Sequence, residues 1–578
     1  MSTQRNILAA LLIFGIFMLI PRYLEILGLN SSDDSLKSLA QNGGNIKDGV
    51  DKIDIEELGY NITDATQTEI QKEIVVVETD YFRAVVSNDG GGSILSYELT
   101  ELDGERYRYI GSYGLDGKYD ENNNVVLLHD LNNQESSCSP CLVGTTSDRV
   151  VQFNQPFQMS PSNDIIDGVL RVLPGEKKKI IYKYDNIEKT LIIDGDSYSM
   201  EHKYVYDLKN IDDVEVLWEV GLFPTEPSIH PSQSYSSDEL SYSSVYAYQD
   251  GDLASITQSS QVGIVETLID EKTDWVAIRT KFFTSIMIPD QKSDYVRLSS
   301  NNLLFRGNDD VLPIYSASMG GYGSRGMLNV VTFLGPLDVE YLDNLGKDKN
   351  ISSIMNFGWS IIKPFSRLVL WTIKSLHNVF GLNYGVVLIL IAVIMRFITA
   401  PLTRKSYESS AKMKMVAPLQ KKIQEKYKND PQRLQKEMGK LWKEHGVNPI
   451  SGCLPMLIQW PILMAFFIVF RSTVEFRGAP FVLWINDLSQ PDYLFSLPFE
   501  LPLYGGSVAV LPILMGISMF LTMRITMQST EGSQKTFMYF MNGFFILIFN
   551  SFPSGLTLYY TMFNFLSYQQ QLSIKNKK

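Results

Sequence analysis

A long apolar run with one arginine inside it most constrains how this chain folds. Residues 385–402 read GVVLILIAVIMRFITAPL, and seventeen of these eighteen residues are compatible with lipid. A run of this length and composition is typical of a transmembrane helix. Arg396 is the exception, because a centrally placed arginine costs roughly 2.5 to 3.5 kcal/mol on insertion scales. The sequence therefore predicts a spanning helix whose arginine needs a special environment.

Charge divides the 578-residue chain into two parts. Residues 28–355 carry 26 Lys and Arg against 53 Asp and Glu, a net charge of −27. The remaining residues carry 25 against 11, a net charge of +14, and hold nearly all the long apolar runs. We therefore expect an acidic, water-soluble part joined to a basic, membrane-embedded part, because the chain is too long for one ordinary domain.

The N-terminus predicts a membrane anchor and a linker. Residues 1–27 contain one apolar run, 7–20, between Arg5 and Arg22. This run is short for a span, so a cleaved signal peptide is the alternative, but no small-residue cleavage site follows it. Residues 28–72 are polar with few aromatic side chains, which is typical of a linker.

From residue 73 to 355 the pattern changes to short strands. Alternating apolar residues, many β-branched and aromatic side chains, and turn clusters such as NDGGGS favour a large all-β domain, a sandwich rather than a parallel α/β fold. Its histidines, His129, His202 and His230, have no catalytic or metal-binding motif around them. We therefore predict no enzymatic activity, no metal site and no cofactor.

Cysteine is sparse, which argues against a disulfide framework. Cys138 and Cys141 form a C-S-P-C sequence, while Cys453 stands alone. A C-S-P-C pair in an oxidising compartment is either a redox site or a local disulfide. Because no thioredoxin-like βαβ pattern surrounds it, the sequence favours the local disulfide.

Residues 356–380 predict a helix that lies in the membrane interface. Lys363, Arg367 and Lys374 share one helical face, and apolar residues cover much of the remainder. The alternative is a surface helix packed on the β domain.

Five further apolar segments complete a prediction of six spans, counted with the N-terminal anchor. They comprise a second span within 381–402 and four more within 450–572, the last two forming a tight hairpin around FPSG. Residues 401–450 carry 12 Lys and Arg against 5 Asp and Glu, so this loop is expected in the cytoplasm. Both termini and the basic tail 573–578 are then cytoplasmic, while residues 28–355 and the loop 471–506 are periplasmic.

Residues 403–449 predict a basic helical hairpin in the cytoplasm. Pro418 is expected to interrupt its first helix, and Asp430-Pro431 is a typical start for the second. Such a hairpin suits docking to acidic partners or to RNA-bearing ones such as a ribosome, and a merely solvated hairpin is the alternative. The lysines assigned to docking are Lys412, Lys414, Lys421 and Lys422.

The environment of Arg396 follows from what the other spans contain. The arginine can lean toward the cytoplasmic interface, pair with an acid, or face a hydrated recess. No Asp or Glu lies within the apolar stretches of the five C-terminal segments, so the sequence favours a recess lined by neutral polar groups. Each candidate is also compatible with ordinary interhelical packing. The candidates are Gln459, Asn550, Thr557, Tyr559, Tyr560, Thr561 and Asn564.

Long motifs run through all five C-terminal segments: MRFITAPLTRKSYESSAKMKMVAP, HGVNPISGCLPMLIQWPI, EFRGAPFVLWINDLS, LPILMGISMF and FPSGLTLYYTMFN. From Phe380 onward the chain resembles the YidC/Oxa/Alb family of membrane protein insertases. An anchor, a large domain and an amphipathic helix before these segments resemble the Gram-negative type. The resemblance implies an α-helical polytopic membrane protein of about six spans with a five-helix insertase core, and a β-supersandwich for the periplasmic domain.

The resemblance also implies a site and a function. Arg396 matches the arginine of a hydrophilic groove open to the cytoplasm and to lipid, and Tyr560 matches the groove tyrosine. An arriving apolar segment would slide along the third and fifth spans, where the candidates are Met464, Phe467, Met538 and Met541. The groove candidates carried forward with Arg396 and Tyr560 are Gln459, Asn550, Thr561 and Asn564.

The function implied is that of an insertase and chaperone for inner-membrane proteins of a Gram-negative bacterium. Its implied partners are nascent membrane proteins, the Sec translocon, the ribosome and signal-recognition machinery through the hairpin and tail, and membrane lipids. A secondary transporter with a large periplasmic sensor domain is the alternative. It would predict internal repeats and membrane-embedded acids, and the sequence contains neither.

Overall fold

The computed structural model divides into a β unit that ends at Ile354 and a helical unit that begins at Met355. It describes residues 70–576, with gaps at 105, 115–117, 130–137, 148, 220, 229–235, 258–262, 305–310, 347, 429, 448–453, 502–503 and 527–531. The predicted anchor, residues 1–27, and the predicted linker up to residue 69 lie outside the described residues.

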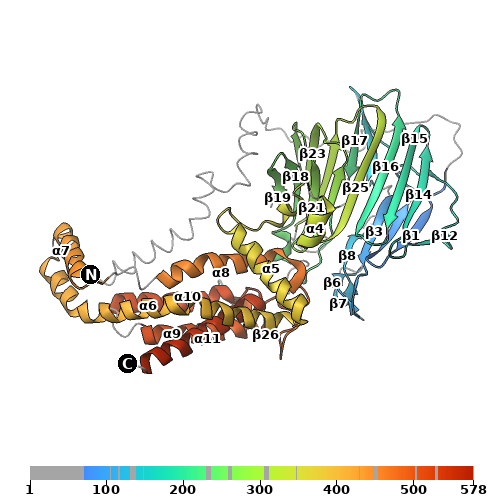
Figure 1. Ribbon diagram of the computed structural model, residues 1–578. Helices are drawn as coiled ribbons and strands as arrows, with labels where there is room; N and C mark the ends of the chain where they lie inside the picture. Colours follow the sequence, from blue (N-terminus) through green and yellow to red (C-terminus); the bar gives the residue numbers. More distant parts are fainter. Residues whose placement is uncertain are drawn as a thin grey trace. The chain divides into compact units, whose positions relative to one another are not determined.

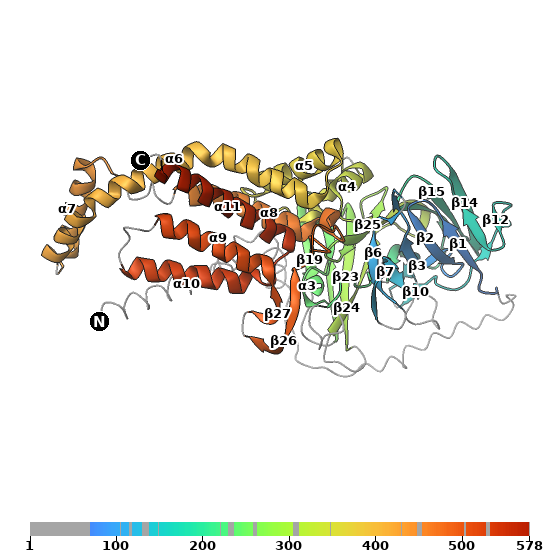
Figure 2. The same cartoon turned by 90° about the horizontal axis from the view of Figure 1, so that it is seen from below.

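The helical unit is a bundle with a short helix on one side and a β hairpin at one end (Figures 1 and 2). Helix α11 packs against α6, α8 and α9, and α10 packs against α9. The elements are α5 (Lys363–Phe380), α6 (Tyr384–Lys426), α7 (Pro431–Glu444), α8 (Leu454–Ser472), a 3₁₀ turn (Val474–Phe476), β26 (Tyr493–Leu501), β27 (Gly505–Ala509), α9 (Val510–Thr526), α10 (Gly532–Phe549) and α11 (Ser554–Asn576).

Helix α6 continues from the predicted second span into the predicted cytoplasmic hairpin. One helix runs through Pro401 and Pro418, so the predicted interruption at Pro418 is wrong. A proline inside a helix removes one backbone hydrogen bond, and the bonds of the flanking turns can keep such a helix continuous. Helix α7 then packs back on the distal part of α6 through a small buried cluster of Val416, Leu441 and Val447.

Among the described residues one helical segment, Tyr384–Ser406, is both long and apolar enough to cross a membrane by these measures alone. Three shorter apolar helical segments accompany it: Gln459–Ser472, Val510–Ile525 and Met538–Phe549. Helix α11 has 23 residues but contains many polar side chains, which explains why it fails the same test.

Helix α5 contains the residues predicted for the interfacial helix. It buries Leu370 and Ile373, and Lys374 pairs with Glu475 at 3.4 Å after the end of α8. Its outward side is apolar, with Leu368 and Trp371 both more than half exposed. On this helix, Lys374 of the basic face is paired with Glu475, whereas the apolar face with Leu368 and Trp371 is exposed.

The β unit consists mainly of one nine-stranded and two six-stranded sheets. The nine-stranded sheet runs, in spatial order, β11 (Gln158–Met159), β14 (Lys177–Tyr184), β15 (Ile187–Asp194), β16 (Ser199–Asp207), β25 (Arg325–Pro336), β22 (Phe283–Pro289), β21 (Trp275–Arg279), β18 (Ser244–Gln249) and β19 (Asp252–Thr257).

The first six-stranded sheet runs β12 (Ile165–Ile166), β13 (Val169–Arg171), β1 (Ile74–Glu78), β2 (Phe82–Ser87), β3 (Ser93–Leu99) and β8 (Val126–His129). The second runs β10 (Val150–Gln152), β9 (Cys141–Thr145), β17 (Asp213–Trp218), β24 (Val311–Gly320), β23 (Tyr295–Leu304) and β20 (Gly263–Ile269). Smaller elements are the pairs β4 (Leu102–Asp103) with β5 (Arg106–Tyr107) and β6 (Ile110–Tyr113) with β7 (Tyr119–Asn124), the helices α3 (Ser237–Leu240) and α4 (Val339–Leu345), and a 3₁₀ turn (Ile351–Met355).

The residue pattern explains why these segments form layered sheets. In β15 buried and half-buried residues alternate, as period-two strands on a core require. Strand β22 is buried at every position, which needs cover on both of its faces. The β14–β15 hairpin closes through Asp185–Asn186, where Asp185 takes a left-handed φ of 46° that aspartate tolerates. The predicted β-rich domain is confirmed.

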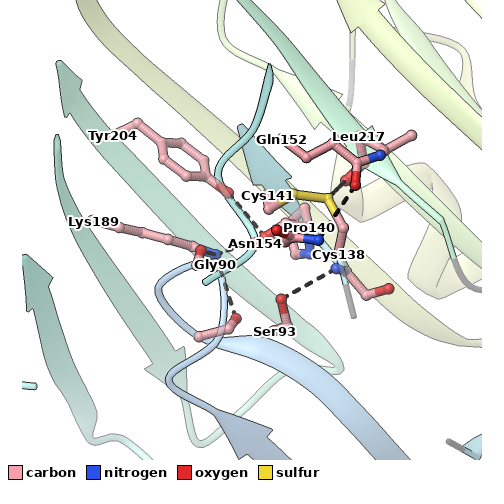
Figure 3. The surroundings of a disulfide bond; sticks show 12 residues. Gly90, Ser93, Cys138, Pro140, Cys141, Gln152, Asn154, Lys189, Tyr204 and Leu217 are labelled. Atoms are coloured by element: carbon pink, nitrogen blue, oxygen red, sulfur yellow. Dashed lines mark hydrogen bonds between the residues drawn. A yellow bond between two sulfur atoms is a disulfide. The ribbon is translucent and has the colours of Figure 1, made fainter. Parts of the chain in front are cut away.

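Figure 3 shows a disulfide between Cys138 and Cys141 in the interior of the β unit. Both sulfurs are fully buried, and the carbonyl of Pro140 between them accepts a bond from Lys189 Nζ at 2.8 Å. Lys189 Nζ also lies 3.3 to 3.4 Å from the carbonyl oxygens of Gly90 and Gly92. Complete burial lowers the pKa of the Lys189 ammonium well below its usual range.

His202 is the second buried base of this core. Its Nε2 lies 2.9 Å from Thr332 Oγ1, while Nδ1 has no hydrogen-bond partner among the described residues. Burial, with a smaller contribution from Lys189, lowers the pKa of His202 well below its usual value. A neutral imidazole that must charge on unfolding links the stability of the β unit to pH.

We expect His202→Leu to flatten the acid side of the stability profile. Unfolded His202 binds a proton as the pH falls through about 6.5, whereas the folded residue does not, so stability is lost below that pH by up to about 1.4 kcal/mol per pH unit. Hydrogen exchange of the β16 amides in the full chain, between pH 7.5 and 5, measures this slope.

The quantity to compare is the difference in pH slope of stability between the His202→Leu variant and the wild type. Glu239 contributes with the opposite sign, because burial beside Glu226 raises its pKa to about 7 and favours the folded state as the pH falls from about 7 to 4.5. Identical slopes in wild type and His202→Leu would show that His202 titrates normally in the folded protein.

Candidate functional site around Arg396

Arg396 lies near the middle of Tyr384–Ser406, the longest apolar helical segment among the described residues. Helix α6 begins after Asn383, whose side-chain oxygen accepts a bond from the Gly385 amide at 2.8 Å. Arg396 follows Tyr384 by twelve residues, which is about 18 Å along a helix. The apolar segment continues to Ser406, so the guanidinium is attached at mid-depth.

Two side chains of α11 hold the guanidinium. Arg396 donates a hydrogen bond to the side-chain oxygen of Gln570, and it lies over the ring of Phe563 with its central carbon 5.7 Å from the ring centroid. Phe563 and Gln570 are seven residues apart and therefore share one face of α11. The contacts consist of one neutral hydrogen bond and one cation–π contact, which leave the positive charge uncancelled.

The described residues supply only part of the hydrogen-bond partners that Arg396 can use, and no counter-charge. Only 8% of the residue is exposed, and its Nε is buried without a hydrogen-bond partner among the described residues. Arginine carries five N–H donors, and leaving a buried donor unpaired costs about 1–3 kcal/mol. The described residues offer no carboxylate within ion-pair distance. The site therefore retains unused hydrogen-bonding capacity for a polar ligand.

Five of the predicted lining residues lie on α11, the helix that makes these contacts: Thr557, Tyr559, Tyr560, Thr561 and Asn564. Tyr560 is buried, its hydroxyl lacks a partner among the described residues, and its ring meets Phe549 edge-on. Thr561 bonds to the carbonyls of Thr557 and Leu511, which joins α11 to α9. Asn564 is half-buried beside Phe563, and its backbone carbonyl accepts a bond from Thr522 of α9.

Asn550 is far from the arginine. Its side chain accepts a bond from the Ala509 amide and donates to the carbonyls of Tyr504 and Ser507, so it supports the β26–β27 hairpin. It precedes the start of α11, whereas Gln570 lies sixteen residues beyond that start, about 24 Å along the helix. Its hydrogen bonds thus indicate a structural role at the end of the bundle, away from Arg396.

The remaining candidates are spread over the other helices. Gln459 of α8 is half-buried, and its side chain has no hydrogen-bond partner in the part of the chain that is described. Met464, Phe467, Met538 and Met541 are all partly exposed on α8 and α10. Lys412, Lys421 and Lys422 are exposed on the distal part of α6, while the side chain of Lys414 is outside the described residues.

Sequence reasoning missed Gln570, the direct partner of Arg396. It sits in a run, YQQQ, at the end of the last predicted span, where polar residues are unremarkable. The available signal was helical spacing, because Phe563 and Gln570 are seven residues apart and fall on one face.

Two protein-family models match the chain, and they divide it between its two structural units. Residues 375–578 match the 60Kd inner membrane protein, and residues 74–368 match the YidC periplasmic domain, which alone is more than half of the chain. The chain belongs to the YidC family. Membership confirms the predicted resemblance, with a β-rich periplasmic domain and a helical C-terminal region.

Relatives that match most of the length of this chain belong to the same family. The membrane protein insertase YidC of Prosthecochloris aestuarii is 36% identical over 86% of this chain and 82% of its own. That of Pelodictyon phaeoclathratiforme is 32% identical over 87% and 83%. A solved YidC insertase structure with its first transmembrane domain is 19% identical, covers 88% of this chain and 93% of its own, and gives a TM-score of 0.32. YidC proteins are insertases and not enzymes, which confirms that prediction.

We expect Asn550→Ala to destabilise the hairpin end of the bundle without touching the arginine. Three backbone groups lose their partner, which should lower local stability by roughly 2–3 kcal/mol. Hydrogen exchange of the amides of β27 reports this loss. Asn564→Ala is the matched control, because that side chain has no hydrogen-bond partner among the described residues. Equal protection in the two variants would contradict the structural role.

Proposed function

We propose that this YidC-family protein inserts integral membrane proteins into the inner membrane and helps them fold, through a hydrophilic groove that contains Arg396. The supporting observation is a buried guanidinium with one neutral hydrogen-bond partner, Gln570, and a buried Nε without one. Such a cation is stable in a bundle only where water or a client supplies the missing partners.

The positive charge gives the groove its action on a client. A polar tail crossing the membrane loses hydration, and a hydrated recess at Arg396 shortens the distance over which that loss occurs. At about 8 Å and an effective dielectric constant of about 20, the guanidinium attracts a client carboxylate by about 2 kcal/mol. Because Gln570 is neutral, this attraction is not cancelled. Burial of the client's apolar helix in lipid then drives release.

The rest of the groove is drawn from the polar residues of the bundle. Tyr560, Thr561, Asn564 and Gln459 line it in this proposal, and Gln570 positions the arginine. An arriving apolar segment moves along the outer sides of the third and fifth spans, where Met464, Phe467, Met538 and Met541 are partly exposed. Methionine side chains adapt to many apolar shapes, which suits a surface with many clients.

We further propose the six-span topology with both termini in the cytoplasm, in the inner membrane of a Gram-negative bacterium. Residues 28–355 are then periplasmic, and α5 lies in the periplasmic interface with Leu368 and Trp371 in lipid. Insertion proceeds alone or beside the Sec translocon. The exposed Lys412, Lys421 and Lys422, with the tail, contact the ribosome and the signal-recognition machinery.

We expect Arg396→Ala to reduce insertion of a small single-span client with an acidic periplasmic tail by about 5- to 30-fold, which corresponds to 1–2 kcal/mol. Arg396→Lys should be milder, because the charge remains. The measurement is client insertion, scored by protease protection, in cells depleted of the endogenous insertase.

The control for this variant is Arg404→Ala, which removes an exposed arginine two turns further along α6. A client with a neutral tail should respond little to either change. Full insertion of the acidic client by Arg396→Ala would rule out the proposed role of the charge.

We expect Gln570→Glu to impair insertion of the same client without removing the arginine. A carboxylate at this position pairs with the guanidinium and cancels its attraction for client acids. Gln569→Glu adds the same charge at nearly the same depth on an exposed position of α11, so it is the matched control. Equal insertion by the two variants would show that Gln570 does not set the charge at Arg396.

A further inference from the structure

The hairpin formed by β26 and β27 exposes large apolar side chains on both of its faces. Leu494 and Phe495 are each 55% exposed, Phe499 is 58% exposed and Leu501 is 42% exposed. These four residues are called the hairpin patch below. A two-stranded ribbon is marginally stable in water by itself, and uncovered apolar side chains on both faces do not improve it. The hairpin patch therefore needs a surrounding that covers both faces.

The hairpin is fixed to the helices by two buried polar side chains. Asn550, directly after α10, bonds to the backbone of Tyr504, Ser507 and Ala509. Asp492, directly before β26, accepts bonds from the amides of Val510 and Leu511 at the start of α9. Figure 2 shows the hairpin at the end of the bundle where α9 begins and α10 ends. The hairpin patch is therefore held at a set depth relative to the bundle.

The first turns of α9 show where the hairpin patch lies relative to the apolar surface of the bundle. Helix α9 begins at the residue after β27, and residues 508–517 read VAVLPILMGI, without a polar side chain. Ile513, Leu514 and Ile517 face outward and are 36% to 51% exposed. The apolar outer surface of the bundle thus starts in the first turn of α9, directly after the hairpin in the chain.

A second apolar projection lies at the same end of the bundle. Val482 is 50% exposed and Leu483 is 84% exposed, and Leu483 takes a left-handed φ of 60° that is unfavourable for leucine. The loop is held in place by Asn383, which donates to the Pro480 carbonyl at the start of α6. This tip is exposed at the level where α6 begins.

The composition of the hairpin fits a lipid headgroup region better than a protein partner. Residues 493–509 contain one charged residue, Glu500, and two tyrosines, Tyr493 and Tyr504. Tyrosine is enriched where hydrocarbon meets the headgroups, whereas a protein docking site ordinarily has a charged rim.

We propose that the hairpin patch and the Val482–Leu483 tip are seated in the lipid leaflet next to the bundle, as a second membrane anchor opposite the cytoplasmic end. Lipid covers both faces of the ribbon at once, which a partner docking on one side does not. The assignment to the periplasmic leaflet rests on the proposed topology, whereas the embedding in lipid does not.

The test uses the full-length chain in vesicles of phosphatidylcholine and phosphatidylglycerol. Single cysteines, Phe499→Cys, Leu494→Cys and Leu483→Cys, are introduced with Cys453→Ser and labelled with an environment-sensitive fluorophore without reductant, so that the Cys138–Cys141 disulfide remains intact. Lipids brominated near the headgroup or near the chain end then quench probes at the matching depth. We expect all three probes to be quenched at least twofold more by the shallow bromines.

Two controls bracket the result. Phe520→Cys, on the outer surface of α9 in the bundle, should be quenched by the deep bromines, and Lys203→Cys, at an exposed position of β16, should be quenched by neither. Hairpin probes that behave like Lys203→Cys would overturn the proposal. A hairpin probe that is shielded from water but is quenched by neither lipid would also overturn the proposal, because protein would then cover it. No client is present, so the outcome is independent of insertion activity.

Discussion

The cost of placing a guanidinium at mid-depth in an apolar bundle is the constraint on which the helical unit depends. Arg396 is covered by Phe563 and bonded by Gln570, both from α11, so these two helices must remain adjacent for the charge to stay in place. The protein stabilises the position of the arginine while leaving its charge intact. A carboxylate partner would bind the cation more tightly and would also neutralise it.

The β unit surrounds a buried lysine in the opposite way. Lys189 has three donors when protonated, and three backbone carbonyls, of Gly90, Gly92 and Pro140, surround it at 2.8 to 3.4 Å. Its hydrogen-bonding capacity is fully used, so it serves to join the disulfide loop to the glycine turn. Arg396 has most of its donors unused. The contrast separates a lysine whose donors all have protein partners when it is protonated from an arginine that has one protein hydrogen bond among the described residues.

The sequence predicts the two-part architecture well because charge and hydropathy differ so strongly between the parts. It also singles out Arg396, since a charge in an apolar run is visible without any structure. It fails where a residue's role depends on what lies across the fold. Asn550 and Gln570 are both polar residues of the last predicted hairpin, yet only the packing shows that one supports the β26–β27 hairpin and the other contacts the arginine.

Local rules also mislead at two positions. Pro418 is a strong signal for a helix break, but α6 continues through it because the loss of one backbone hydrogen bond is small beside the bonds that remain. Lys189 lies on the inward side of β15, between Ile187 and Leu191. Strict alternation would have placed it in the core, whereas its charge suggested the surface, and alternation was the better guide.

The continuity of α6 has a mechanical consequence. From Arg396 to Lys422 the helix advances twenty-six residues, about 39 Å along its axis, without a break. A rotation of a few degrees about Arg396 therefore corresponds to a displacement of several ångströms at Lys422, at the far end of this length of helix. Pro401 and Pro418 each remove one backbone hydrogen bond, so they are the positions at which this helix bends most easily. The buried arginine and the exposed lysines thus belong to one continuous helix.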